Sequence, residues 1–211
     1  MAMNPTTTGA AEWTRFFPGE GTSRPDVLHA RFVRHAYSRH THDEYVVGLI
    51  ETGVQRFDLE RAVHYAPAGS IFLINPGESH AGGSGLPDGY VYRTFYPPEN
   101  LIRAVAAEFA AASTALPSFV KPVVTDPQLT DALLAFHRSL ADTSAMLEQE
   151  THLRHAISLL VRRHTQPWSS NWRLTRIFRD LSMTRSERLG LATMASPASA
   201  SKGTSGGALP M

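Results

Sequence analysis

Two short segments that carry histidines, separated by strand-like sequence, constrain the fold of this chain more than any other feature. The first reads His-Thr-His-Asp-Glu, and the second ends in Asn-Pro-Gly-Glu-Ser-His. Because alternate residues of an extended strand face the same way, we expect His40, His42 and Glu44 to point to one face. A later strand that ends in a Pro-Gly turn can deliver His80 to the same place. The sequence therefore predicts a cluster of imidazole and carboxylate groups inside a β-structure.

Residues 27–96 have the pattern of an all-β region. Short β-rich runs recur at about ten-residue spacing, with glycine and proline turns between them. The runs are residues 28–33, 45–50, 55–59, 70–74 and 90–96. Short strands at this spacing are typical of a sandwich or barrel.

The chain changes from strand-like to helical period after two consecutive prolines, Pro97 and Pro98. Helices are expected over residues 99–112, from Pro127 onward with Asp126 as the N-cap, and over residues 144–164. The sequence therefore predicts a mainly β fold, with a barrel over about residues 24–96 followed by two or three α-helices.

An apolar stripe runs along the third expected helix. Its members are Met146, Leu153, Ile157 and Leu160. Two interpretations are open: the stripe packs against the chain's own barrel, or it forms a helix–helix seam, which needs only a partly matching heptad pattern. Under the second interpretation the chain is a homodimer through this helix.

Composition excludes several classes of protein. The chain has no cysteine, so disulfide scaffolds, cysteine-ligated zinc and thiol catalysis are excluded. It contains no apolar run of about 18 residues and no signal-peptide pattern, so we expect a cytoplasmic protein without a membrane segment. The formal net charge is only +1, but seven arginines between residues 162 and 190 stand against two acids. Any affinity for nucleic acid is therefore expected at the C-terminal end.

Both ends of the chain have a distinct composition. Residues 1–23 predict a flexible arm, and its aromatic side chains Trp13, Phe16 and Phe17 are suited to pack onto something. Residues 166–211 predict a basic linker and a disordered tail rich in Ser, Ala, Gly, Pro and Thr. The folded domain is expected over residues 24–165.

The histidine cluster supports two kinds of chemistry. Its imidazole and carboxylate groups can ligate a divalent transition metal such as Fe, Mn, Ni or Zn, with His40, His42, Glu44 and His80 as candidate ligands. The same four side chains can form hydrogen bonds to a small organic effector within apolar walls. Arg93 lies on the last β-rich run, where an anion anchor in the pocket and a solvated strand face are equally plausible.

These motifs together resemble the effector-binding and dimerisation domain of AraC-type transcription regulators, a cupin-type jelly roll. The resemblance covers about residues 27–165. It rests on His40, His42, Asp43, Tyr45, Gly48, Glu51, Gly53, Asn75 to Glu78, His80, Gly89, Tyr90, Tyr92 and Arg93. It implies a small-molecule sensor that is not an enzyme, with the aromatic arm as a candidate lid over the pocket.

The resemblance also bears on the metal alternative, a metal-dependent cupin enzyme such as an isomerase or dioxygenase. Metal-binding cupins place a glutamate four or five positions past their second histidine, but here Glu44 comes two positions past His42. The second motif is one residue shorter than the usual form. Both departures favour an organic effector and no metal cofactor.

Regulators of this type carry two helix-turn-helix units after the sensor. Here 47 residues follow His164, and two such units need roughly twice that length. We therefore expect a regulator truncated before its DNA-binding domain, or a free-standing sensor. Such a chain does not recognise a specific operator by itself, but it can pair with a full-length relative.

Overall fold

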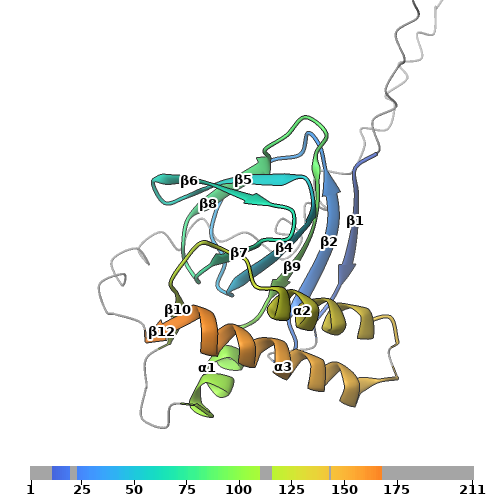
Figure 1. Cartoon of the computed structure of the whole chain (residues 1–211), viewed down its shortest axis with the longest axis vertical. Helices are drawn as coiled ribbons and strands as arrows, with labels where there is room; N and C mark the ends of the chain where they lie inside the picture. The colour runs from blue at the N-terminus through green and yellow to red at the C-terminus, as the bar shows by residue number, and fades with distance from the viewer. Residues whose placement is uncertain (1–10, 20–22, 110–115, 143, 168–211) are drawn as a thin grey trace, which may run out of the picture.

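The computed structural model describes residues 11–19, 23–109, 116–142 and 144–167. Two antiparallel sheets face each other, and three helices lie together beneath them (Figure 1). This is a double-stranded β-helix of the cupin type followed by helices. The predicted fold class is confirmed. The predicted linker and tail over residues 166–211 lie almost wholly outside the described residues.

The larger sheet has six strands. In spatial order they are β1 (Trp13–Phe17), β2 (Asp26–Phe32), β9 (Tyr90–Tyr96), β4 (Val46–Thr52), β7 (Ile71–Ile74) and β11 (Val123–Val124). The central strand β9 pairs antiparallel with both β2 and β4. The sheet therefore joins the arm, the barrel and the segment that precedes the second helix.

The smaller sheet has four strands and closes the barrel. In spatial order they are β3 (Tyr37–His40), β8 (His80–Ser84), β5 (Val54–Leu59) and β6 (Ala62–Pro67). A separate pair, β10 (Pro117–Phe119) and β12 (Thr165–Pro167), ties the end of the last helix to the segment before β11.

The helices are α1 (Glu99–Ala107), α2 (Pro127–Ser139) and α3 (Met146–His164). The α2 helix begins as the sequence predicts, because the Asp126 side chain accepts a hydrogen bond from the backbone N–H of Leu129. In the described part of the chain no helix is long and apolar enough to cross a bilayer.

The central strands of the six-stranded sheet are largely buried on both faces, and strand alternation divides their side chains between two cores. On β9, Tyr90, Tyr92 and Tyr96 belong to the core between the two sheets. Phe95 points the other way, into the core between the sheet and the helices, where its ring lies 6.0 Å from that of Phe136. The helices therefore complete the fold by covering the outer face of this sheet.

The predicted flexible arm contains an ordered strand. Residues 13–17 form β1, which pairs with β2 from Trp13 opposite Arg31 to Phe17 opposite Val27. Just before the strand, the Glu12 carboxylate accepts hydrogen bonds from three successive backbone N–H groups, at 2.6 to 2.8 Å. This part of the arm is therefore an edge strand of the sheet rather than a flexible segment.

The apolar stripe on α3 is not a dimer seam. Leu153, Ile157 and Leu160 are buried in the chain's own helix-side core, and Met146 is 62% exposed. These three side chains pack inside the chain, as the first interpretation expects, but α3 packs mainly on α2 and α1. Homodimerisation, or pairing with a full-length relative, therefore has no basis in these three side chains.

Replacement of Leu160 tests this assignment. Leu160→Ala removes a fully buried side chain, so we expect it to lower the free energy of unfolding by about 2–5 kcal/mol in urea denaturation. Leu147→Ala is the matched control, because Leu147 on the same helix is 79% exposed. Its effect should stay below about 0.5 kcal/mol. Unchanged stability together with a shift from dimer to monomer in Leu160→Ala would restore the seam.

Candidate functional site

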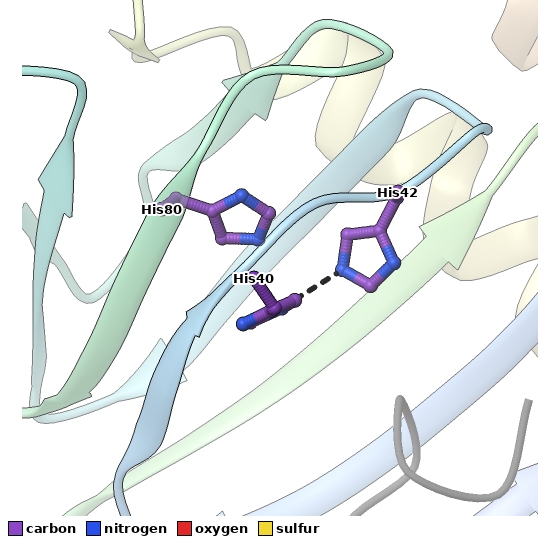
Figure 2. A group of neighbouring side chains, drawn as sticks. All are labelled: His40, His42 and His80. Atoms are coloured by element: carbon purple, nitrogen blue, oxygen red, sulfur yellow. Dashed lines mark hydrogen bonds between the residues drawn. The ribbon is translucent and has the colours of Figure 1, made fainter. Parts of the chain in front are cut away.

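Three histidines converge inside the barrel. His40 ends β3 and pairs directly with His80, the first residue of β8, while His42 lies two residues beyond the end of β3. Their imidazole rings face one another (Figure 2), and each side chain is at most 7% exposed. One ring nitrogen from each lies within 4.8 Å of the others. The predicted convergence of these three side chains is therefore present.

Backbone carbonyls fix the tautomers of two of these rings. Nδ1 of His40 lies 2.7 Å from the Ser38 carbonyl oxygen, and Nδ1 of His80 lies 2.9 Å from that of Glu78. A carbonyl only accepts, so both Nδ1 atoms carry the proton and both Nε2 atoms present a lone pair. Nε2 of His42 then donates to Nε2 of His40 at 3.1 Å (Figure 2).

Burial also sets the charge of the cluster. It lowers the pKa of His40, and it lowers the pKa of His80 to about 3, with the neighbouring His40 adding to the effect. Both rings are therefore neutral at physiological pH. The cluster offers lone pairs to a ligand rather than positive charge.

The Asn-Pro-Gly-Glu turn at residues 75–78 positions the histidine cluster through hydrogen bonds. Gly77, with φ of +78°, donates its N–H to the carbonyl of His42 at 2.8 Å. The Glu78 carboxylate accepts from the backbone and side-chain N–H groups of Asn75 at 2.8 and 3.1 Å. The Asn75 side-chain oxygen in turn accepts from the N–H of Phe119 at 2.7 Å. The turn therefore fixes the backbone of His42 close to the start of β8, the strand that begins with His80.

The histidines line a cavity between the two sheets. It contains about 410 Å³ of space, counting the part open to solvent. The lining residues are Tyr37, His40, His42, Val46, Gln55, Phe57, Phe72, Ile74, His80, Ala81, Gly82, Tyr92, Thr94 and Tyr96. A few polar groups within apolar and aromatic walls are typical of small-molecule sites.

One glycine shapes the wall of this cavity. Gly48 on β4 is opposite Phe72 on β7, and a Cβ at Gly48 would lie 1.9 Å from the Phe72 ring. The missing side chain therefore lets the ring lie across the strand, which explains why a glycine interrupts an otherwise apolar run.

Glu44 does not join the cluster. The alternation that predicts its position holds only while the chain stays extended; His42, two residues past the end of β3, still joins the cluster, but the chain then turns. A bend at residues 43–44 redirects the chain before β4 begins, and Glu44 is half-buried outside the cavity lining. The candidate metal-ligand set therefore has three members, not four.

Arg93 also lies outside the cavity, because it alternates with the cavity-lining residues of β9. Its guanidinium donates to the Glu51 carboxylate and contacts the His137 ring of α2, with Nη1 2.5 Å from Nδ1. Glu51 also pairs with His29 at 3.0 Å. The prediction that Arg93 anchors an anion in the pocket is wrong. Arg93 is instead a half-buried link between the sheet and α2.

The aromatic side chains of the arm do not form a lid over the cavity. Trp13 packs edge-on against His29 with ring centres 4.7 Å apart, and Phe17 packs in the same way against His137 at 4.9 Å. Both therefore lie on the helix side of the sheet. Phe16 packs against the core between the sheets, but it is not among the cavity-lining residues.

Several polar residues line the cavity although no sequence motif marks them. Tyr37, Gln55, Thr94 and Tyr96 were not singled out as site residues. Strand alternation offers a signal for two of them, because Thr94 and Tyr96 share a face with Tyr92. The sequence provides no comparable signal for Gln55, whose position depends on how β5 pairs with β8.

Comparisons with known proteins agree with this architecture. A family model described as the AraC-like ligand binding domain matches residues 25–157. Among solved structures, the AraC-like transcriptional activator CuxR is similar with a TM-score of 0.51 at 14% identity, over 72% of this chain and 57% of that chain. This likeness shows a common fold.

Smaller cupin structures match part of the chain. KdgF from Halomonas sp. matches with a TM-score of 0.36 at 18% identity, over 46% of this chain and 88% of that chain. An RmlC-like cupin family protein with a double-stranded β-helix fold from Methanocaldococcus jannaschii matches with a TM-score of 0.39 at 14% identity, over 46% and 90%. A search of curated proteins gives no significant match.

The ion pairs of Glu51 make stability depend on pH. The hydrogen bond from His29, with that from Arg93, lowers the pKa of Glu51 to about 2 from its usual 4.5. The carboxylate therefore stabilises the fold fully above pH 4.5, and this contribution is lost as the pH falls towards 2. We expect Glu51→Gln to lower the free energy of unfolding at neutral pH by on the order of 1–2 kcal/mol, and by less at about pH 3.

Asp58→Asn is the control for Glu51→Gln. Asp58 pairs with Arg56, whose side chain is 42% exposed, so the loss should stay below about 1 kcal/mol. Urea denaturation at several pH values measures both variants. A difference between Glu51→Gln and the wild type that does not change with pH would contradict the assignment.

Proposed function

Since the chain belongs to the family of AraC-like ligand-binding domains, we propose that it senses a small organic effector in the cavity lined by His40, His42 and His80. The observation that carries the proposal is the convergence of three buried imidazoles within apolar walls. In this proposal the chain is a cytoplasmic regulatory module and not an enzyme.

The cavity has the two properties that effector binding requires. Phe57, Phe72 and Ile74 supply an apolar surface, and burial of a ligand's apolar atoms against it favours binding. The Nε2 lone pair of His80 supplies a fixed hydrogen-bond acceptor, because a backbone carbonyl orients the ring. Because these groups are held before a ligand arrives, little ordering cost remains to be met on binding.

A thermal-shift screen tests the proposed sensor. A ligand that binds the folded state must raise the melting temperature, so a broad library of small metabolites should yield compounds that raise it in the wild type. His42→Ala and His80→Ala should abolish the shift, whereas His155→Ala should keep it, because His155 is exposed on α3. Shifts that survive in both cavity variants would show that the effector binds elsewhere.

A second candidate is that the three histidines hold a divalent transition metal. Two nitrogen ligands about 2.0–2.1 Å from one ion lie roughly 3.0–3.4 Å apart. The Nε2 atoms of His40 and His42 are 3.1 Å apart, so these two rings fit such an ion. The carbonyls that accept from Nδ1 of His40 and His80 orient both rings as the outer partners of metal ligands do.

Elemental analysis of the purified protein discriminates between the two candidates. If the metal site is real, protein dialysed against Zn²⁺, Mn²⁺, Fe²⁺ or Ni²⁺ should retain about one ion per chain. His42→Ala should lose the ion, and the exposed His155→Ala should keep it. A substoichiometric metal content that is equal in both variants would remove this candidate.

A further inference from the structure

The outer strand of the smaller sheet, β6, is an open edge. It comes last in the spatial order of that sheet and, among the described strands, pairs only with β5. Its sequence, Ala-Val-His-Tyr-Ala-Pro, contains no charged residue. Val63 is 49% exposed and Tyr65 is 56% exposed. Folded proteins usually protect sheet edges with charged side chains, so an uncharged open edge points to a partner strand.

The hydrogen bonds of the β5–β6 hairpin decide which backbone groups face the edge. The register of the hairpin continues to Gly53 opposite Ala68, where the N–H of Ala68 donates to the carbonyl of Gly53 at 2.9 Å. Along an antiparallel strand, residues that bond to the partner alternate with residues that do not. His64 therefore bonds to β5, while the N–H and C=O groups of Val63 and Tyr65 point outward. No other described residue forms a backbone hydrogen bond with these groups.

The open part of the edge is confined to these two residues. Pro67 has no N–H, and its carbonyl oxygen accepts from the N–H and the hydroxyl of Ser70, at 3.0 and 2.6 Å. At the other end, the turn at residues 60–61 precedes the strand. The available backbone groups therefore lie symmetrically about His64.

A second copy of the same strand matches this symmetry. When two β6 strands run antiparallel with His64 opposite His64, Val63 of each copy lies opposite Tyr65 of the other. Residues paired in this way exchange both of their backbone hydrogen bonds, so every group that the two edges present finds a partner. A register shifted by two residues instead places Pro67, which cannot donate, or the turn residue Arg61 in the pairing.

The side chains and charges on the exposed face suit the same register. Aromatic and β-branched side chains are favourable cross-strand neighbours, and each Val63 meets a Tyr65. Next to them on β5, Asp58 lies opposite Val63 and Arg56 lies opposite Tyr65, and these two charges form an ion pair at 3.0 Å. In the two-fold arrangement Asp58 of one copy shares a row with Arg56 of the other. No like charges on this face are therefore brought together.

We propose that β6 is an interface between two copies of this chain, which pair edge to edge into one sheet of eight strands, four from each copy. A contact of this kind uses the same patch on both copies and closes as a two-fold dimer. The hairpin lies away from the three helices (Figure 1), so the helices take no part in it. The inference goes beyond the proposed effector sensing and does not depend on it.

Sedimentation equilibrium and amide hydrogen exchange of the full chain test the dimer and its register. Because the contact is short, we expect a reversible monomer–dimer equilibrium between about 10 µM and about 1 mM. The N–H groups of Val63 and Tyr65 should exchange more slowly as the dimer fraction rises, whereas that of His64 should stay slow throughout. A monomer up to about 1 mM would overturn the inference. Protection of Val63 and Tyr65 at every concentration would also overturn it, because another segment of the chain would then cover the edge.

Charge reversal tests the paired side chains. Lysine at both positions (Val63→Lys with Tyr65→Lys), or glutamate at both, places like charges opposite each other, so each variant should dimerise at least about tenfold more weakly. An equimolar mixture of the two variants should form a dimer again, because the lysines of one face the glutamates of the other. Both side chains are about half exposed, so the variants should keep the melting temperature of the wild type.

Met146→Lys with Leu147→Lys is the matched control. These side chains are also apolar and are 62% and 79% exposed, but they lie on α3. Dimerisation of this variant should equal that of the wild type. Loss of the dimer in the α3 variant, with an unchanged dimer in both β6 variants, would place the interface on the helix and overturn the inference. Loss in both β6 variants without recovery in the mixture would contradict the pairing of Val63 with Tyr65.

Discussion

Burial of the six-stranded sheet on both faces is the constraint on which the rest of the structure depends. A polar side chain in the buried middle of this sheet needs a hydrogen-bond partner on whichever side it faces. On the helix side, His29, Glu51, Arg93 and His137 satisfy one another. On the barrel side, the hydroxyl of Thr94 has no such partner among the described residues. One face of the sheet therefore carries a hydrogen-bonded polar network, and the other face lines the cavity.

The turn at residues 75–78 shows how a short polar motif can position a site without entering it. Its backbone and side chains form hydrogen bonds to one another, to the carbonyl of His42 and to the N–H of Phe119. These bonds connect the loop after β3, the strand before β8 and the β10 segment. Because all three segments meet at the turn, the histidine rings keep their separation although they come from distant parts of the sequence.

Local rules predicted the elements of this fold well and the directions of some side chains poorly. The N-cap at Asp126 and the delivery of His80 by a turn both depend on neighbouring residues, and both are present. The prediction for Glu44 fails because the chain bends at residues 43–44, just after His42, and alternation does not predict that bend. The prediction for Arg93 fails because both faces of β9 are covered, so alternation cannot say which face lines the cavity. The dimer seam at Leu160 fails because helical periodicity marks an apolar face but cannot say whether the chain's own core or a second chain covers it.

The alternation of β9 also determines how an occupied cavity affects the rest of the molecule. Tyr92, Thr94 and Tyr96 line the cavity, while Arg93 and Phe95 between them contact His137 and Phe136 of α2. Packed interiors transmit small displacements because they contain few voids. If a bound ligand shifted this strand, the contacts of α2 would change with it, and α2 in turn packs on α3. The link between cavity and helices needs no mobile lid, because a single buried strand contacts both.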